Sequence, residues 1–124
     1  MRLSRKPDLD PEIVRQHGAE ELDHLRRRVG LWRDDFLRQA PPGGGPEWLF
    51  LVREFHAEID EWLYPYVRRL VETEHITAVE GADFMDYCYR QVLMVAAHLG
   101  IVEEVPEGAG FDALPLIYHR SQGG

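Results

Sequence analysis

Three long segments in which apolar residues recur every three or four positions constrain the fold of this chain more than any other feature. This spacing places the apolar side chains on one face of an α-helix. Because each helix has one such face to bury, the chain is predicted to be all-α and to form an antiparallel three-helix bundle. The three stripes are Leu22, Leu25, Val29, Trp32 and Phe36; then Val52, Phe55, Ile59, Trp62, Tyr66 and Leu70; then Met85, Cys88, Val92, Val95 and Leu99.

Capping and breaker residues set the ends of the predicted helices. Asp10-Pro11 is typical of an N-cap followed by the first helical residue. The run PPGGGP separates the first helix from the second. Thr77 and Glu80 match a capping box, and Gly100 is suited to end the third helix. We therefore expect helices at about 11–39, 47–75 and 78–99, with a tight turn near Ile76.

Pro65 lies inside the second predicted helix. Proline lacks a backbone N–H and crowds the preceding turn, so it bends or breaks a helix. Because the apolar stripe continues across this position to Tyr66, we predict a kink with the stripe in phase.

The length of 124 residues fits one domain, which at this size buries about two-thirds of the surface of its unfolded chain. We expect residues 1–124 to form one helical domain, with an N-terminal arm at 1–9 and an extended tail at 101–124 on the bundle or on a partner subunit. The longest apolar run, 92–97, is far shorter than the roughly 20 residues of a membrane span, and we expect no secretory signal, because the basic N-terminal residues are not followed by an apolar run. The sequence predicts a cytoplasmic protein that does not bind membranes.

The charge distribution argues against nucleic-acid binding. Residues 1–40 hold nine basic and eight acidic side chains, and the rest of the chain, with net charge −9, would repel phosphates. Arg26, Arg27 and Arg28 are consecutive, so on a helix they point in different directions and are expected to be solvated or salt-bridged. A nucleic-acid binder that uses this first helix stays as a third alternative.

Cys88 is the one cysteine of the chain and falls on the third apolar stripe. A lone cysteine cannot form a disulfide within the chain, and at this position a small buried hydrophobic residue is the expected role. No hydroxyl or thiol has an evident base beside it, so no catalytic residue and no cofactor are predicted.

Three carboxylates, Glu54, Glu58 and Glu61, share the face of the second helix opposite its apolar stripe. The segment AEIDE at 57–61, followed by EGAD at 80–83 on the next helix, resembles the paired acidic motifs of the MazG-type all-helical nucleotide pyrophosphohydrolases. This resemblance covers about 25 residues and implies an all-helical, magnesium-dependent enzyme that hydrolyses nucleotides. Ala57 stands where that family has a glutamate.

A tight turn near Ile76 argues against this alternative. It places Asp83 about 12 Å along the bundle from Glu61, whereas Mg²⁺ binds its oxygens at about 2.1 Å. We expect these acids to be solvated or paired, Glu61 with Arg90 and Asp83 with Arg68 or Arg69.

Two Glu-x-x-His motifs, ending at His24 and His75, have the spacing of helical carboxylate–histidine metal sites. The predicted register places His24 level with Trp62 and far from His75, so we do not expect the motifs to meet. Glu54 and His98 come level across the hairpin, but a capping or packing histidine is favoured there. No metal is therefore predicted, and the alternative ligands are Glu54, Glu58, Glu61, Asp83 and His98.

The third helix has apolar residues outside its stripe. Such surface needs a cover, which the tail or a second subunit would supply. We predict a homodimer or a complex with another protein, and hence a self-association or partner-binding module without catalytic activity. The predicted interface residues are Leu31, Tyr64, Leu93, Met94, Ala97, Phe111 and Tyr118.

Overall fold

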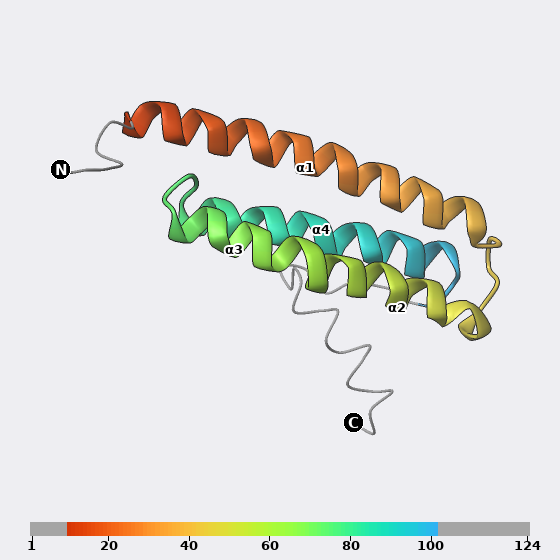
Figure 1. Cartoon of the computed structure of the whole chain (residues 1–124). Coiled ribbons are helices and arrows are strands. Elements are labelled where there is room, and N and C mark those ends of the chain that lie inside the picture. The colour runs from red at the N-terminus through yellow and green to blue at the C-terminus, as the bar shows by residue number, and fades with distance from the viewer. Residues whose placement is uncertain (1–9, 102–124) are drawn as a thin grey trace, which may run out of the picture.

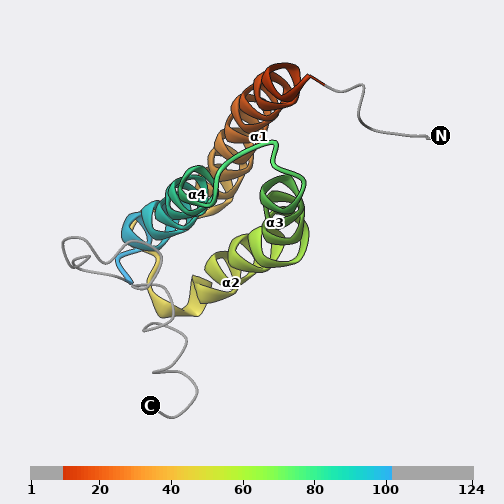
Figure 2. The same cartoon turned by 90° about the vertical axis from the view of Figure 1, so that its left-hand side faces the viewer.

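The computed structural model describes residues 10–101, in which three helical segments lie side by side (Figure 1). The end-on view shows them surrounding a common centre (Figure 2). The prediction of an all-α, antiparallel three-helix bundle is confirmed. The first segment is α1 (Pro11–Gln39) and the third is α4 (Ala78–His98). The second contains the 3₁₀ turn η2 (Pro46–Trp48), α2 (Leu49–Glu58), the π-helical turn η3 (Ile59–Leu63) and α3 (Tyr64–Glu72).

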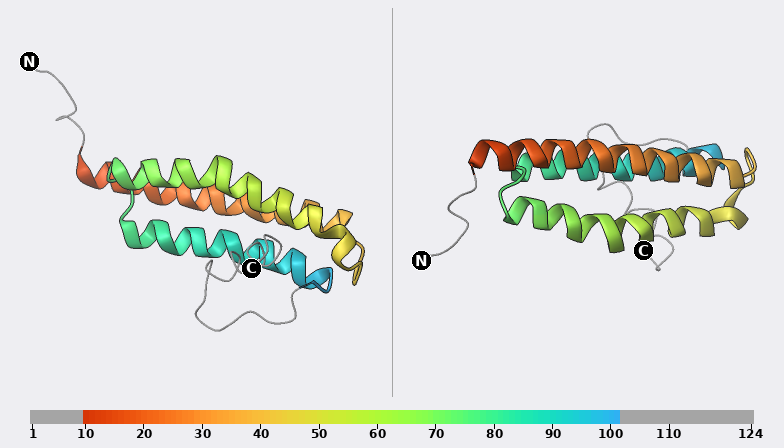
Figure 3. Two further views of the ribbon diagram at one scale, coloured as in Figure 1. Left: turned by 90° about the horizontal axis from the view of Figure 1, so that it is seen from below. Right: turned by 45° about the horizontal axis from the view of Figure 1, so that its top comes forward.

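Helices α1 and α4 run in the same direction, and the second segment runs back between them. Arg15 contacts Glu80 near the start of both helices, and the His98 ring lies 2.9 Å from the Ala40 carbonyl near their ends. Helices α2 and α3 follow one another along one path past α1 and α4 (Figure 3). The bundle is therefore up-down-up, with α1 and α4 as parallel neighbours.

The predicted helix caps are present. The Asp10 carboxylate accepts a hydrogen bond of 3.0 Å from the Glu12 amide, and Thr77 and Glu80 form both bonds of the capping box. At the end of α4, Gly100 has a φ of 78°, and the Ile101 amide donates to the Ala96 carbonyl at 2.9 Å. This arrangement satisfies carbonyls that a helix end leaves without partners.

The glycine linker also closes the end of α4. The Gly43 amide donates to the His98 carbonyl and the Gly45 amide to the Leu99 carbonyl, both at 2.8 Å. These two glycines have φ values of 66° and 91°, a conformation that other residues rarely adopt. The linker is thus a structural cap as well as a connection.

Gly18 is required by the close approach of α1 to the turn between α3 and α4. A Cβ atom at this position would lie 2.0 Å from the His75 carbonyl oxygen, which is inside van der Waals contact. The absence of a side chain here therefore sets the distance between α1 and the α3–α4 turn.

The π-helical turn changes which residues of the second segment are buried. The Tyr64 amide donates to the Ile59 carbonyl, five residues back instead of four. Leu63 and Val67 are therefore in the core, whereas Trp62 is 68% exposed and Tyr66 is 39% exposed. The prediction that the stripe continues in phase through Trp62 and Tyr66 is wrong. One extra residue in the turn rotates everything after it by about 100° relative to a regular α-helix.

Leu93 also differs from the prediction. It was expected to point outward, but it is 4% exposed and belongs to the core. Two other predicted interface residues, Phe111 and Tyr118, lie outside the described residues, as do the arm at 1–9 and the tail from 102 onward. Within residues 10–101 no helix has the length and apolar character needed to cross a membrane.

Candidate interaction surface

A surface pocket of about 290 Å³ lies between α1 and the part of the second segment that contains η3. We call it the aromatic groove. Leu25, Trp32 and Leu63 contribute its more buried part, and Trp62 and Tyr66 are exposed at its edge. The remaining lining residues are charged or titratable, namely Glu21, His24, Arg28 and Glu58. The groove therefore combines apolar rings with charges of both signs.

Trp62 is the most unusual member of the groove. Tryptophan has a large apolar ring and is usually well buried, yet this side chain is 68% exposed. The π-helical turn is the cause, because Leu63 and Val67 take the core positions that Trp62 and Tyr66 would fill in a regular helix. Exposed tryptophan and tyrosine are the residue types that most often dominate the binding energy of protein interfaces.

Tyr66 connects the α3 and α1 walls of the groove by a hydrogen bond. Its hydroxyl donates a hydrogen bond of 2.9 Å to the Glu21 carboxylate on α1. Burial raises the pKa of Tyr66, and the hydrogen bond and negative charge of Glu21 raise it further. The phenol therefore stays protonated and acts as a donor at neutral pH.

The charged residues at the rim have no ion-pair partner within the described part of the chain. Arg28 on α1 and Glu58 on α2 line the same pocket as Trp62, but neither forms an ion pair among residues 10–101. The three consecutive arginines do point in different directions, as predicted. Arg27 pairs with Asp23, and Arg26 stacks near aromatic rings of α4.

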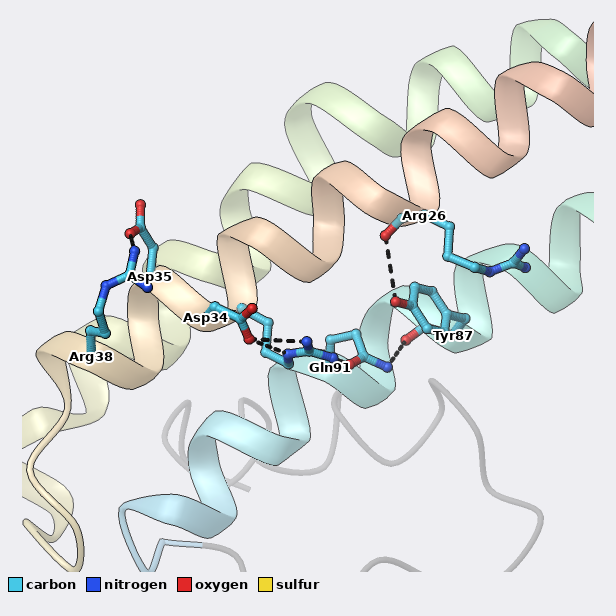
Figure 4. Close-up of polar contacts among 7 residues, drawn as sticks. Arg26, Asp34, Asp35, Arg38, Tyr87 and Gln91 are labelled. Atoms are coloured by element: carbon cyan, nitrogen blue, oxygen red, sulfur yellow. Dashed lines mark hydrogen bonds and ion pairs between the residues drawn. The ribbon is translucent and has the colours of Figure 1, made fainter.

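The contact between α1 and α4 uses a different set of polar residues (Figure 4). The Arg26 guanidinium lies 5.1 Å from the centre of the Tyr87 ring. Buried Gln91 accepts a hydrogen bond of 2.8 Å from Arg33 and donates one of 3.1 Å to the Tyr87 carbonyl. These contacts satisfy both ends of the buried Gln91 amide, and the bond from Arg33 holds α1 against α4.

A second polar cluster joins η3 to α4. The Asp60 carboxylate accepts a hydrogen bond from the Tyr89 hydroxyl, and its other oxygen lies 3.3 Å from His56 Nδ1. Burial and the Asp60 carboxylate raise the pKa of Tyr89. Burial lowers the pKa of His56, against the opposing effect of Asp60. Tyr89 is thus a protonated donor whose hydrogen bond attaches the π-helical turn to α4.

The alternative metal ligands do not come together in the described structure. Glu54, Glu58 and Glu61 are exposed on the second segment, and Asp83 is exposed on α4. The His98 ring contacts the Ala40 carbonyl, as expected of a packing histidine. Residues 10–101 contain no group of three or more His, Cys, Asp or Glu side chains that could hold a metal ion.

Two of the arginines predicted to pair across the hairpin form ion pairs within their own helices. Arg90 pairs with Asp86 at 2.8 Å and Arg68 with Glu72 at 3.3 Å, each one helical turn apart. Such exposed pairs stabilise a helix by only about 0.3–0.5 kcal/mol each.

His24 and His75 lie at different levels of the bundle, because the His75 backbone packs against Gly18, six residues before His24 on α1. Both side chains line one surface pocket of about 560 Å³, together with His17. His75 is also held within its own turn, because its Nδ1 lies 2.6 Å from the Thr73 hydroxyl. This pocket adjoins the aromatic groove and shares Glu21, His24 and Tyr66 with it.

Cys88 is fully buried in the core, which confirms its predicted role as a small apolar residue. Burial raises the pKa of its thiol to about 12. Because the thiolate is the nucleophilic form, this side chain is not suited to thiol chemistry at neutral pH.

The structure changes the candidate interface in two ways. Leu31, Tyr64, Met94 and Ala97 are exposed, so their place in an interface stays a prediction, whereas Leu93 is removed from the set. Trp62 and Tyr66 were missed, because regular helical spacing assigned them to the core. Pro65 was the available signal, since a proline within a helix often accompanies a change of hydrogen-bond pattern.

No family model, no curated protein and no solved structure matches this chain.

Proposed function

We propose that this protein is a small, acidic, cytoplasmic module that self-associates as a homodimer or binds another protein, and that it has no catalytic activity. The observation that carries the proposal is the exposure of Trp62 at the edge of the aromatic groove. Burying a large apolar side chain against a partner contributes roughly 1.5–3 kcal/mol, which is about a fifth to a third of the about 8 kcal/mol of a micromolar complex.

The exposed apolar surface is not limited to Trp62. Leu31, Tyr64, Tyr66 and Met94 are exposed as well, while the bundle has a well-filled core of its own. Apolar rings gathered at one groove, as Trp62 and Tyr66 are, are more typical of a site of protein association than apolar residues scattered singly. Net charge −8 makes nucleic acid a poor partner, which favours protein over phosphate-rich ligands.

Size-exclusion chromatography with light scattering, from about 1 to about 100 µM protein, tests self-association over the affinity range of such interfaces. We expect a dimer whose fraction rises with concentration. If the chain stays monomeric throughout and captures no protein partner, the proposal is wrong.

The same preparation separates a binding module from a magnesium-dependent nucleotide pyrophosphohydrolase. We expect no release of pyrophosphate or phosphate from nucleoside triphosphates with Mg²⁺. Release that Glu58→Gln abolishes, and that Glu72→Gln leaves intact, would overturn the non-catalytic assignment.

A further inference from the structure

Given the self-association proposed above, we infer that the second copy docks on the aromatic groove, with a two-fold axis along the groove, so that Arg28 of each chain faces the partner's Glu58. The inference depends on that proposed function and adds the surface, the partner and their relative orientation. Three properties of the groove support it: its exposed rings, its unpaired charges and the placement of these charges on opposite walls.

The exposed rings require an apolar partner. Trp62 and Tyr66 stand above Leu25, Trp32 and Leu63, so apolar atoms continue from the bundle core to the surface at this place. A second copy presents the same apolar surface. Packing the two grooves face to face removes both tryptophan rings from water, which is the main driving force for association of helical surfaces.

The charges at the rim need a partner of mixed sign. Arg28 stands on the α1 wall and Glu58 on the α2 wall, with neither in an ion pair within residues 10–101. Glu54, one turn before Glu58, extends the acidic wall. A uniformly acidic or basic ligand would leave one wall facing like charge, whereas a second copy offers both signs.

The direction of the two-fold axis is determined by which helical walls of the two grooves must face each other. A closed dimer is isologous, so any contact from residue i to residue j occurs twice. An axis across the groove would place each wall on its own equivalent, arginine against arginine. An axis along the groove instead places each α1 against the partner's α2 and α3, which brings the partner's Glu58 opposite Arg28 at one level of the bundle. Trp62 then lies against the partner's Arg28 and the partner's Trp32, a favourable place for a cation–π contact.

In this arrangement α1 of one chain packs against the α2–α3 segment of its partner, and the α2–α3 segment of the first chain packs against the partner's α1. Each helix is antiparallel to the one that it meets across the interface, because rotation about an axis along the groove preserves the helix directions. Such layers have the packing of an antiparallel four-helix bundle. Met94 lies on α4 and is not one of the residues that line the groove.

Charge reversal provides the sharpest test. Arg28→Glu should raise the dimer Kd at least about tenfold, because the introduced carboxylate of each chain would face the partner's Glu58. Glu58→Arg should do the same by placing arginine against arginine. Mixing the two weakened variants should restore a dimer, since opposite charges then face each other at both cross-chain contacts. Arg68→Glu, at the exposed Arg68–Glu72 pair on α3, makes the same change of charge outside the groove and should leave the Kd within about twofold.

Aromatic truncation tests the same surface independently. Trp62→Ala should also raise the Kd at least about tenfold, while Met94→Ala should leave it unchanged. Circular dichroism should confirm that each variant is folded, which is expected because all the altered side chains are exposed.

The outcomes distinguish this inference from the function that it deepens. A dimer that resists Trp62→Ala and both charge reversals, but dissociates with Met94→Ala, keeps self-association and overturns the groove as its site. A wild-type chain that is monomeric throughout but binds another protein overturns the inference alone, and one that is monomeric and binds no protein overturns both. The fluorescence of Trp62 in the monomer is the difference between the emission of the wild type and that of Trp62→Phe. If this difference is the emission of a buried indole, another segment of the same chain fills the groove, which also overturns the inference.

Discussion

Helix α4 and the segment from α2 to α3 carry similar apolar patterns but bury them differently. In α4 every residue of the predicted stripe, from Met85 to Leu99, is buried along one uninterrupted helix. In the other segment the stripe is buried as far as Ile59 and again at Leu70, but between these residues Leu63 and Val67 replace Trp62 and Tyr66 in the core. The two segments differ in one local feature, the π-helical turn at Ile59–Leu63.

The comparison shows that a regular apolar pattern does not by itself fix the phase of a helix. One wider turn advances the chain by an extra residue, so two sets of apolar residues compete for the core in α3. Leu63 and Val67 pack as branched aliphatic side chains in the core, and the larger rings are left at the surface. The same local change therefore fills the core and creates the aromatic groove.

The largest expected effect comes from truncating Leu63, the residue that takes the core position at this phase change. Leu63 is 3% exposed, so Leu63→Ala should lower the free energy of unfolding by about 2–5 kcal/mol through lost burial and an unfilled cavity. Trp62→Ala, at the neighbouring position, should change it by less than about 1 kcal/mol in the monomer, because little of that ring is buried. Urea unfolding at a concentration where the chain is monomeric measures both.

A reversed order, with Trp62→Ala the more damaging variant, would mean that the second helix keeps regular phase. Val92→Ala in α4 provides the reference, since Val92 is buried in the helix whose phase was predicted correctly.

Most of the fold was predictable because its determinants are local. Asp10, the Thr77–Glu80 capping box and Gly100 act through hydrogen bonds within a few residues, so the sequence alone identifies them. The competition between Trp62 and Leu63 is not local. It depends on which side chain fits against the other helices, and no spacing rule includes that information.

The candidate site was predicted less well for the same reason. The sequence placed an interface on exposed apolar residues such as Leu31 and Met94, which are indeed exposed. It assigned Trp62 to the core and Leu93 to the surface, and both assignments were wrong. The error at Trp62 comes from the π-helical turn, which regular helical spacing does not include.

A smaller effect is expected from the hydrogen bond that attaches the π-helical turn to α4. Tyr89→Phe removes the hydroxyl that donates to Asp60 but keeps the ring, so it should lower the free energy of unfolding by about 1–2 kcal/mol. Tyr64→Phe, at an exposed tyrosine on α3, should have almost no effect. Equal effects of the two substitutions in urea unfolding would show that the Asp60 contact does not stabilise this junction.

Replacing Pro65 asks whether the proline alone maintains the π-helical turn. Because Pro65 lies in the first turn of α3, where a missing N–H is tolerated, Pro65→Ala should change the free energy of unfolding by at most about 1 kcal/mol. We expect the turn to persist, since Leu63 and Val67 still fill the core. At a concentration where the chain is monomeric, the emission of Trp62, obtained by subtracting that of Trp62→Phe, should remain that of an exposed indole. A shift to the emission of a buried indole would mean that Pro65 is what keeps the helix from regular phase.

The smallest expected effect is a pH dependence at the same junction. Burial lowers the pKa of His56 in the folded chain below its ordinary value of 6.5, so the unfolded chain binds this proton more readily. The contribution of His56 to stability should therefore fall as the pH drops below about 6.5, and it should stop changing once the pH is below the folded pKa. Asp60 opposes the shift, which keeps the effect small. Urea unfolding between about pH 7.5 and about pH 5 should show a shallower loss of stability for His56→Gln than for the wild type, with exposed His17→Gln as the control. A steeper loss for His56→Gln would mean that the attraction of Asp60 for the charged imidazole outweighs its burial, so that protonation strengthens the contact between η3 and α4.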